Sequence, residues 1–362
     1  MLVDPSHWSD RRVLVTGHTG FKGAWLSLWL TEMGARVTGL ALAPETPSLF
    51  SQLDLAQLVT HVEGDIRDEA TVDRVIKDAA PQTVFHLAAQ PIVRLSYDEP
   101  RETFATNVQG TVNVLDACRR VADLEAIVAI TSDKCYENRE WIWPYRESDP
   151  MGGHDPYSAS KGAAELVIGS YRSSFFCNDG QPLLASVRAG NVIGGGDWGK
   201  NRLVPDIVRS ISADETVAIR SPHAVRPWQH VLEALGGYLL IAQGLARGDR
   251  SFASAWNFGP SSQDAKAVLW IVERMLERWG KGSYVLEANG GRHEANLLKL
   301  DCSKAHSEIG WRPAFSIDDT IDWIVDWHKA HHEGAELREF SIRQLREYRD
   351  RMDQTLRESF NA

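Results

Sequence analysis

The sequence predicts an α/β protein built on a doubly wound parallel sheet, with a smaller lobe in its C-terminal part. Short apolar runs alternate with helical stretches through the first half of the chain, which is the pattern of βαβ units. The runs are continuously apolar, as expected of strands that are buried on both faces. A glycine-rich turn at 17–23 follows the first of them.

The first expected strand, 12–16, is a β-branched run that ends in glycine. The first helix is expected at 22–33, where Trp25, Leu26, Trp29 and Leu30 recur at helical spacing. By the same criteria, further strands are expected at 36–42, 59–64, 83–87 and 126–130, and further helices at 71–79, 103–121 and 157–168.

The composition of the chain changes near residue 190, so we expect one domain over 1–190 and a second lobe over 191–362, with some C-terminal segments returning to the first. Glycines at 194–196 predict a loop, Pro205 predicts the beginning of a helix, and 213–232 is rich in charge and turns. Further helices are expected at 265–280, 317–331 and 334–358.

The net charge of −10 argues against a nucleic-acid-binding protein, because phosphate contacts need clustered Lys and Arg. We expect no signal peptide and no membrane span, since no apolar run approaches ~18 residues. No cluster of His, Cys or carboxylates has metal-ligand spacing, so no metal is predicted. The four cysteines are scattered and predict reduced thiols in a cytoplasmic enzyme: Cys118, Cys135, Cys177 and Cys302.

The turn at 17–23 has the spacing G-x-x-G-x-x-G, between an expected strand and an expected helix. Glycine allows a tight turn and close approach of the backbone to a pyrophosphate, and the helix N-terminus offers free N–H groups. In this context the motif predicts a Rossmann-type dinucleotide site formed by Gly17, His18, Thr19, Gly20, Phe21, Lys22 and Gly23.

Tyr157 and Lys161 are four residues apart, which in a helix places both side chains on one face. A phenol is a poor base at neutral pH, and a neighbouring ammonium group lowers its pKa. Ser132 precedes this pair at the end of an apolar run. The three residues form a candidate catalytic group in which the lysine would stabilise the phenolate of the tyrosine.

Together, these features resemble the extended short-chain dehydrogenase/reductase family. The resemblance implies NAD as the cofactor, and it extends to three further segments: an adenine-contacting Asp–hydrophobic pair, a loop that passes the cofactor, and a helix asparagine that steadies the strand carrying the active site. The residues implied in NAD binding, beyond the glycine motif, are Asp65, Ile66, Leu87, Ala88, Ala89, Asn107, Tyr157 and Lys161.

One expected feature of a dinucleotide site is missing after the second strand. The segment 39–44 contains neither an acid for the adenosine ribose nor an arginine for a 2′-phosphate. The residues therefore leave NAD versus NADP open, and the choice of NAD comes from the resemblance. We expect NAD to bind more weakly than in relatives that have the acid.

Segment 130–138 resembles the nucleotide-sugar 4,6-dehydratases of this family, and with 17–20 it resembles those that act on CDP-glucose, over about residues 10–330. The resemblance implies that Tyr157 takes the C4 hydroxyl proton while NAD carries hydride from C4 to C6. It implies that Ser132 bonds the substrate hydroxyl, Asp133 protonates the departing C6 hydroxyl, and Lys161 lowers the pKa of Tyr157. The product is a 4-keto-6-deoxy sugar, of the kind used for O-antigen lipopolysaccharide.

Lys134 stands where these dehydratases have the glutamate that removes the C5 proton. A lysine can act as that base only when it is neutral, so its pKa would have to be lowered by burial or by nearby positive charge. The alternative is a cation that stabilises the enolate or a phosphate, with another group as the base.

On the substrate side, the resemblance implies that Asn191 and Arg226 bind the sugar diphosphate and that the segment around Arg202 and Leu203 covers the base. A planar guanidinium suits phosphate oxygens. Gln90 and Arg292 are further candidates for substrate binding, and a surface arginine remains the alternative for both Arg226 and Arg292.

Two other functions remain open at this point. A UDP-sugar 4-epimerase of the same family would leave Asp133 with a structural role only. A non-catalytic NAD(P)-sensing protein could use the same fold without chemistry. By resemblance we also expect a homodimer or homotetramer that forms through helices 103–120 and 158–174.

Overall fold

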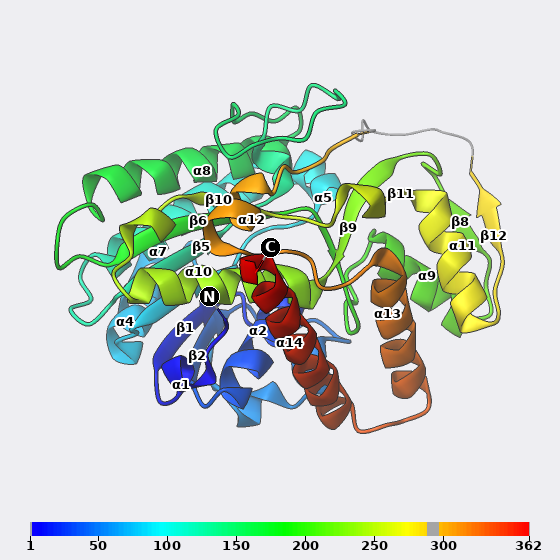
Figure 1. The fold of residues 1–362 in the computed structure, drawn as a ribbon, viewed down its shortest axis with the longest axis horizontal. Helices are drawn as coiled ribbons and strands as arrows, with labels where there is room; N and C mark the ends of the chain where they lie inside the picture. The colour runs from blue at the N-terminus through cyan, green and yellow to red at the C-terminus, as the bar shows by residue number, and fades with distance from the viewer. Residues whose placement is uncertain (1, 288–296, 362) are drawn as a thin grey trace.

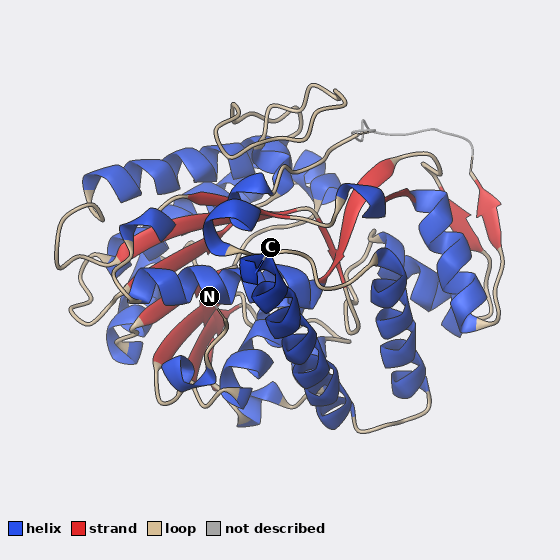
Figure 2. Ribbon diagram, in the orientation of Figure 1, coloured by secondary structure: helices blue, strands red, loops and turns tan. Residues whose placement is uncertain are grey.

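A seven-stranded sheet forms the centre of the computed structural model, which describes residues 2–287 and 297–361 (Figures 1 and 2). The strand order is β10-β6-β5-β4-β1-β2-β3, and all pairings are parallel. The chain proceeds outward from β1 to one edge and then fills the other side, which confirms the predicted doubly wound sheet. The strands are β1 (Arg12–Thr16), β2 (Arg36–Ala41), β3 (Thr60–Glu63), β4 (Thr83–His86), β5 (Ala126–Ile130), β6 (Leu183–Ala189) and β10 (Ala255–Phe258).

Helices cover both faces of this sheet (Figure 2). One layer contains α2 (Phe21–Glu32) and α10 (Val231–Ala246), with α14 (Leu337–Asn361) lying across both, and the other contains α4 (Glu69–Ala79), α7 (Gly110–Cys118) and α8 (Pro156–Ser174). Successive strand residues point to opposite faces, so Val13 and Val15 pack in the first layer while Leu14 packs in the second. Burial on both faces explains the continuous apolar runs of the sequence.

A second group of elements lies beside the main sheet and encloses its own apolar cluster, which includes Ile207, Ile271 and Ile324. It contains a three-stranded sheet in the order β11-β9-β7 and a two-stranded sheet of β12 and β8. Its elements are β7 (Asn191–Ile193), α9 (Leu203–Ser212), β8 (Val217–Ile219), β9 (Val225–His230), β11 (Ala265–Ala267), α11 (Val268–Trp279), β12 (Tyr284–Leu286) and α13 (Ile317–His332).

The long helix expected at 103–121 is divided into three parts: α6 (Pro100–Phe104), a π-helical turn η2 (Ala105–Gln109), and α7. Short π-helical segments are rare and often occur at functional sites. The remaining elements are α1 (Pro5–Trp8), α3 (Leu49–Gln52), η1 (Leu55–Gln57), α5 (Val93–Asp98), η3 (Asp133–Cys135), η4 (Arg250–Phe252), η5 (Ser262–Asp264) and α12 (Ser303–Ile309).

Several boundaries in the C-terminal part differ from the expectation. Helix α11 begins at Val268, not at 265, because residues 265–267 form β11, which pairs with β9. Helix α9 begins at Leu203, before Pro205, because proline is tolerated in the first turn of a helix, where backbone N–H groups have no intrahelical partner. The segment 213–232, expected to be turns, contains β8 and β9, and β9 pairs with two neighbours. Tertiary pairing therefore outweighs the local turn signals there.

Within 2–287 and 297–361, no helix is long and apolar enough to cross a membrane. In the same ranges, no group of three or more His, Cys, Asp or Glu side chains could hold a metal ion. All four cysteines are free thiols.

Candidate functional site

The loops that follow β1, β4, β5 and β6 carry most of the residues singled out in the sequence. The carboxyl ends of parallel strands lie at one edge of a sheet, so these loops meet there. The loop after β1 is the glycine motif, and the loop after β5 carries Ser132, Asp133 and Lys134. Helix α8 presents Tyr157 and Lys161 to the same region.

The glycine motif forms a surface of bare backbone at the start of α2. Gly17 has φ +77°, and a Cβ there would lie 2.8 Å from the backbone N of Ala88. A Cβ on Gly23 would lie 2.2 Å from the carbonyl oxygen of Gly17, and Gly20 caps the helix. Only glycine fits at 17 and 23, and the free N–H groups of the first turn of α2 lie beside them. This arrangement suits the pyrophosphate of a dinucleotide.

The other side chains of the motif have varied surroundings. The hydroxyl of Thr19 donates to the carbonyl oxygen of Leu42 at 3.0 Å. Phe21 is half-buried beside Gly194. The imidazole of His18 is fully buried and hydrogen-bonds His61 at 2.7 Å, so this side chain is turned into the interior rather than towards a ligand.

His18 packs against β2, the strand after which the sequence lacks the expected acid. A Cβ on Gly39 of β2 would lie 2.2 Å from the ring of His18, so the ring packs directly on that strand. Burial, with a smaller effect from His61, lowers the pKa of His18 to about 4. A neutral His18, hydrogen-bonded to His61, therefore lies against the strand whose end normally carries the ribose-binding acid.

Lys22 is the charged member of the motif. Its ammonium group lies 3.4 Å from the hydroxyl of Tyr238 on α10. Burial, with smaller effects from Lys161 and Arg202, lowers the pKa of Lys22 to about 8, while Asp133 raises it. Lys22 therefore belongs to the same charged environment as the residues predicted to be catalytic.

The adenine-side residues are well ordered by local contacts. The carboxylate of Asp65 pairs with Arg67, which holds the pKa of Asp65 below its usual value. Ile66 is buried against Gly110 of α7, and its carbonyl oxygen accepts from Asn113 at 2.9 Å.

After β4, the segment Leu87–Ala89 passes directly over Gly17, and the backbone N of Ala88 donates to the hydroxyl of Thr16 at 3.2 Å. Asn107, in the π-helical turn, fixes the end of this loop. Its amide oxygen accepts from the backbone N of Gln90 at 2.8 Å, and its amide nitrogen donates to the backbone oxygen of Gln90 at 3.1 Å and to Ser160 at 2.8 Å.

The loop after β5 folds into the 3₁₀ turn η3, capped by Ser132. The hydroxyl of Ser132 donates to Oδ1 of Asp133 at 2.9 Å and accepts from the backbone N of Lys134 at 3.2 Å. Asp133 is buried, and its Oδ2 has no hydrogen-bond partner among the described residues. A buried carboxylate oxygen without a partner is unfavourable unless a ligand or a proton satisfies it. Lys134 is half-buried.

Tyr157 and Lys161 lie on α8 as the spacing predicted, and both are buried. The expected lowering of the pKa of Tyr157 by Lys161 is not what the folded chain gives. Burial raises the pKa of Tyr157 to about 12, against the lowering effects of a hydrogen bond with Ser132 and of Arg202. Burial also lowers the pKa of Lys161 to about 8. The four-residue spacing indicates that Tyr157 and Lys161 are close, but it does not indicate that burial removes water from both groups and shifts their pKa values.

The substrate-side residues fall into two groups. Arg202 caps α9, and its guanidinium donates to both oxygens of buried Asp197 at 3.0 and 3.1 Å; Leu203 follows it. Asn191 and Arg226 lie in β7 and β9, which are neighbours in the three-stranded sheet. Arg226 is buried, so it is not a surface arginine. The side chain of Gln90 donates to Thr103 of α6 at 2.9 Å.

Arg292 lies outside the described residues. Three residues that the sequence analysis did not single out also shape the site: Thr16, which holds Ala88; Asp197, which holds Arg202; and Glu165, one helical turn beyond Lys161. The opposite charges of Asp197 and Arg202, five residues apart, and the four-residue spacing of Lys161 and Glu165 are signals that could have identified two of them.

Comparison with known proteins yields one family over most of the chain. Residues 14–324 match the family described as GDP-mannose 4,6 dehydratase. The chain is 53% identical to a CDP-glucose 4,6-dehydratase of Salmonella typhimurium, over 96% of this chain and 98% of that protein.

Solved structures share the fold. A double mutant of the dTDP-glucose 4,6-dehydratase DesIV from Streptomyces venezuelae, with NAD bound, superposes with a TM-score of 0.77, at 24% identity, over 90% of this chain and 99% of that one. UDP-glucose 4-epimerase from Thermotoga maritima, with UDP-glucose, gives a TM-score of 0.76 at 21% identity, over 88% and 99% of the two chains.

We expect Gly23→Ala to weaken NAD binding. The added methyl would overlap the carbonyl oxygen of Gly17, and overpacking of about 1–3 kcal/mol corresponds to a rise of about 5- to 150-fold in Kd. Gly169→Ala on α8 is the matched control, since a Cβ there meets nothing within 4 Å. Isothermal titration calorimetry measures the Kd of NAD for both variants. Equal affinities would contradict the placement of the pyrophosphate at the glycine motif.

Proposed function

This chain belongs to the GDP-mannose 4,6-dehydratase family of nucleotide-sugar dehydratases, and we propose that it converts CDP-glucose into CDP-4-keto-6-deoxyglucose and water. It is an NAD-dependent nucleotide-sugar 4,6-dehydratase, a hydro-lyase. The observation that carries the proposal is the position of Asp133. This buried carboxylate is hydrogen-bonded to Ser132, lies in the charged environment of Tyr157, and has one oxygen with no partner among the described residues. The choice of CDP is supported by the high identity to the Salmonella enzyme.

NAD, when bound, would supply the hydride acceptor for C4 of the sugar and the hydride donor for C6. Gly17, Gly20 and Gly23 would hold its pyrophosphate against the first turn of α2. Asp65 and Ile66 would hold the adenine. The loop 87–89, fixed by Asn107, would pass beside the dinucleotide, and Lys161 would hold the nicotinamide ribose.

The chain's own groups would move the protons. Tyr157 would receive the C4 hydroxyl proton at its phenolic oxygen, with Ser132 hydrogen-bonding the same hydroxyl. Because burial disfavours the phenolate, nearby positive charge is needed to stabilise it, and Arg202 is placed to supply that charge. Asp133 would deliver a proton from Oδ2 to the departing C6 hydroxyl. We propose Lys134 as the base for the C5 proton.

We propose that the sugar nucleotide lies between the 1–190 domain and the 191–362 lobe. Asn191 and buried Arg226 would meet the diphosphate, since a guanidinium held in place by its surroundings binds phosphate oxygens well. Arg202 and Leu203, at the start of α9, would cover the base. We further propose a cytoplasmic enzyme, because free thiols persist in a reducing compartment.

The central experiment is incubation with NAD and, separately, with CDP-, dTDP-, GDP- and UDP-glucose, followed by mass spectrometry. We expect loss of the mass of one water from CDP-glucose alone. Water loss from another nucleotide sugar would support a dehydratase that prefers a different nucleotide base. Interconversion of glucose and galactose forms without water loss would replace the proposal with a 4-epimerase, and no reaction with NAD bound would favour a sensing protein.

Two substitutions test the proposed acid and the proposed C5 base separately: Asp133→Asn and Lys134→Ala. We expect Asp133→Asn to lower kcat by about 10²–10⁴-fold while solvent deuterium still enters C5, because the amide cannot protonate the leaving hydroxyl. We expect Lys134→Ala to abolish that exchange. NMR monitors the entry of solvent deuterium at C5. A normal rate of exchange in Lys134→Ala would show that another group is the C5 base and that Lys134 acts only as a cation.

We propose that the chain forms a homodimer or homotetramer through the helices around 103–120 and 158–174. Leu166 on α8 is 67% exposed and Phe104 on α6 is 39% exposed, which leaves apolar surface on both. We expect Leu166→Glu to yield monomers in light scattering coupled to gel filtration. Leu286→Glu, at an exposed position on β12, is the control, and an unchanged mass for Leu166→Glu would contradict this interface.

A further inference from the structure

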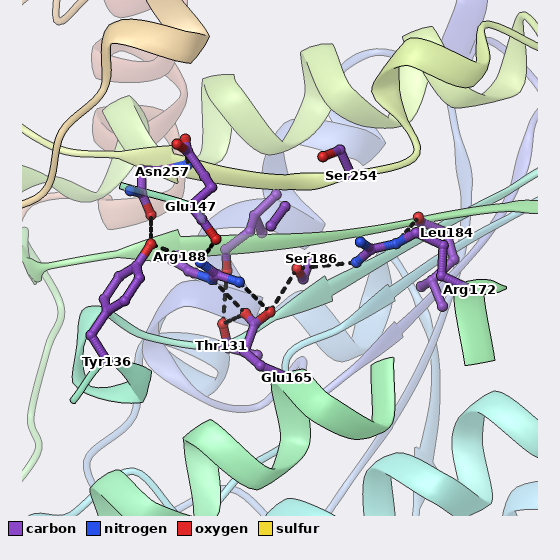
Figure 3. Close-up of polar contacts among 12 residues, drawn as sticks. Thr131, Tyr136, Glu147, Glu165, Arg172, Leu184, Ser186, Arg188, Ser254 and Asn257 are labelled. Carbon is purple, nitrogen blue, oxygen red and sulfur yellow. Dashed lines mark hydrogen bonds and ion pairs between the residues drawn. The ribbon is translucent and has the colours of Figure 1, made fainter. Parts of the chain in front are cut away.

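A charged pair with almost no exposure to water joins α8 to β6. The side chains of Glu165 and Arg188 are only 3% and 4% exposed (Figure 3). Nη2 of Arg188 lies 2.7 Å from Oε2 of Glu165, and Nε lies 2.9 Å from Oε1, so the guanidinium binds both carboxylate oxygens. Burial opposes the charge on Glu165, but Arg188 holds the pKa of this carboxyl below its usual value.

The carboxylate of Glu165 connects the two halves of the candidate site. On one side, the hydroxyl of Thr131 donates to Oε1, and Thr131 directly precedes Ser132 and Asp133. On the other side, Glu165 lies on α8 four residues after Lys161 and eight after Tyr157. One carboxylate thus ties the turn that carries Asp133 to the helix that carries Tyr157; Figure 3 shows Glu165 beside Thr131.

Arg188 fixes the far end of the same turn. Its Nη1 donates to the hydroxyl of Tyr136 at 2.7 Å and to the backbone oxygen of Glu147 at 3.1 Å. The hydroxyl of Tyr136 donates in turn to Asn257 of β10 at 2.8 Å. The segment 131–136 is therefore held at both ends by one ion pair, with Ser132, Asp133 and Lys134 between the two attachments.

We propose that Glu165 and Arg188 are positioning residues: they hold the 131–136 turn against α8 and so set the alignment of Ser132 and Asp133 with Tyr157. A buried ion pair adds little net stability, because the loss of water around both charges offsets their attraction. Stability alone therefore does not account for this pair, whereas a fixed distance between two catalytic segments does. This inference rests on the proposed dehydratase function.

Two hydroxyls donate to the same carboxylate and provide a matched comparison. Thr131 donates to Oε1 and Ser186 of β6 donates to Oε2 at 2.9 Å, and both side chains are buried. Thr131→Val keeps the shape of the side chain and removes the attachment of the turn. Ser186→Ala removes a similar hydrogen bond at a strand position that carries no proposed reacting group.

We expect both variants to lose similar thermal stability, measured by differential scanning fluorimetry. With CDP-glucose and NAD, Thr131→Val should lower kcat by about 10–100-fold with little change in KM, because misplacement of about 1 Å costs rate rather than binding. Ser186→Ala should keep its kcat. Tyr136→Phe, which releases the other end of the turn, should behave like Thr131→Val and provides a second test should that variant not fold.

The pH profile gives a readout that a purely structural role would not change. The hydrogen bond with Ser132 lowers the pKa of Tyr157. If Thr131→Val misaligns Ser132, the pKa of Tyr157 should rise, and the acidic limb of the pH profile of kcat should move to higher pH. Ser186→Ala should leave the profile unchanged. Equal losses of kcat in Thr131→Val and Ser186→Ala, with unshifted pH profiles, would overturn the positioning role but not the proposed dehydratase function. A wild-type protein that releases no water from any nucleotide glucose would overturn the proposed function and this inference with it.

Discussion

A parallel sheet brings the carboxyl ends of its strands to one edge, but the backbone that leaves this edge has no strand partner. Its polar groups must therefore find other partners, and at several points here side chains supply them. Thr16 does so for the loop after β4 where it crosses Gly17, and Asn107 does so where the loop ends at Gln90. Glu165 holds the loop after β5 through Thr131. The candidate site is thus a set of loops whose positions are fixed by hydrogen bonds from buried side chains.

The burial that fixes these loops also sets their chemistry. Removing water disfavours the charged form of every group, so the pKa of Tyr157 is raised to about 12 while those of Lys161 and Lys22 are lowered to about 8. The chain by itself therefore favours the neutral phenol. The ionised form becomes accessible only when positive charge is held close by, and Arg202, fixed by Asp197, already acts in that direction.

Patterns that depend on neighbouring residues in the chain could be predicted from the sequence. The strands of the main sheet, the glycine turn and the spacing of Tyr157 and Lys161 are such patterns. The π-helical turn at 105–109 was missed because its hydrogen-bond register depends on packing around Asn107. Strands β8 and β9 were missed because their partners are distant in the sequence, and the inward turn of His18 depends on the space that Gly39 leaves.

Helix α8 shows why the same sequence pattern yields some functional residues and not others. Tyr157, Lys161 and Glu165 follow one another at intervals of four, but each interval rotates the side chain by roughly 40° beyond a full turn. Tyr157 and Lys161 are therefore directed towards the site, whereas Glu165 has rotated far enough to point between β5 and β6 (Figure 3). Its partners Ser186 and Arg188 come from β6, and its partner Thr131 directly follows β5. Periodicity could place Glu165 near Lys161, but only the parallel pairing of β5 with β6 brings the guanidinium that keeps it charged.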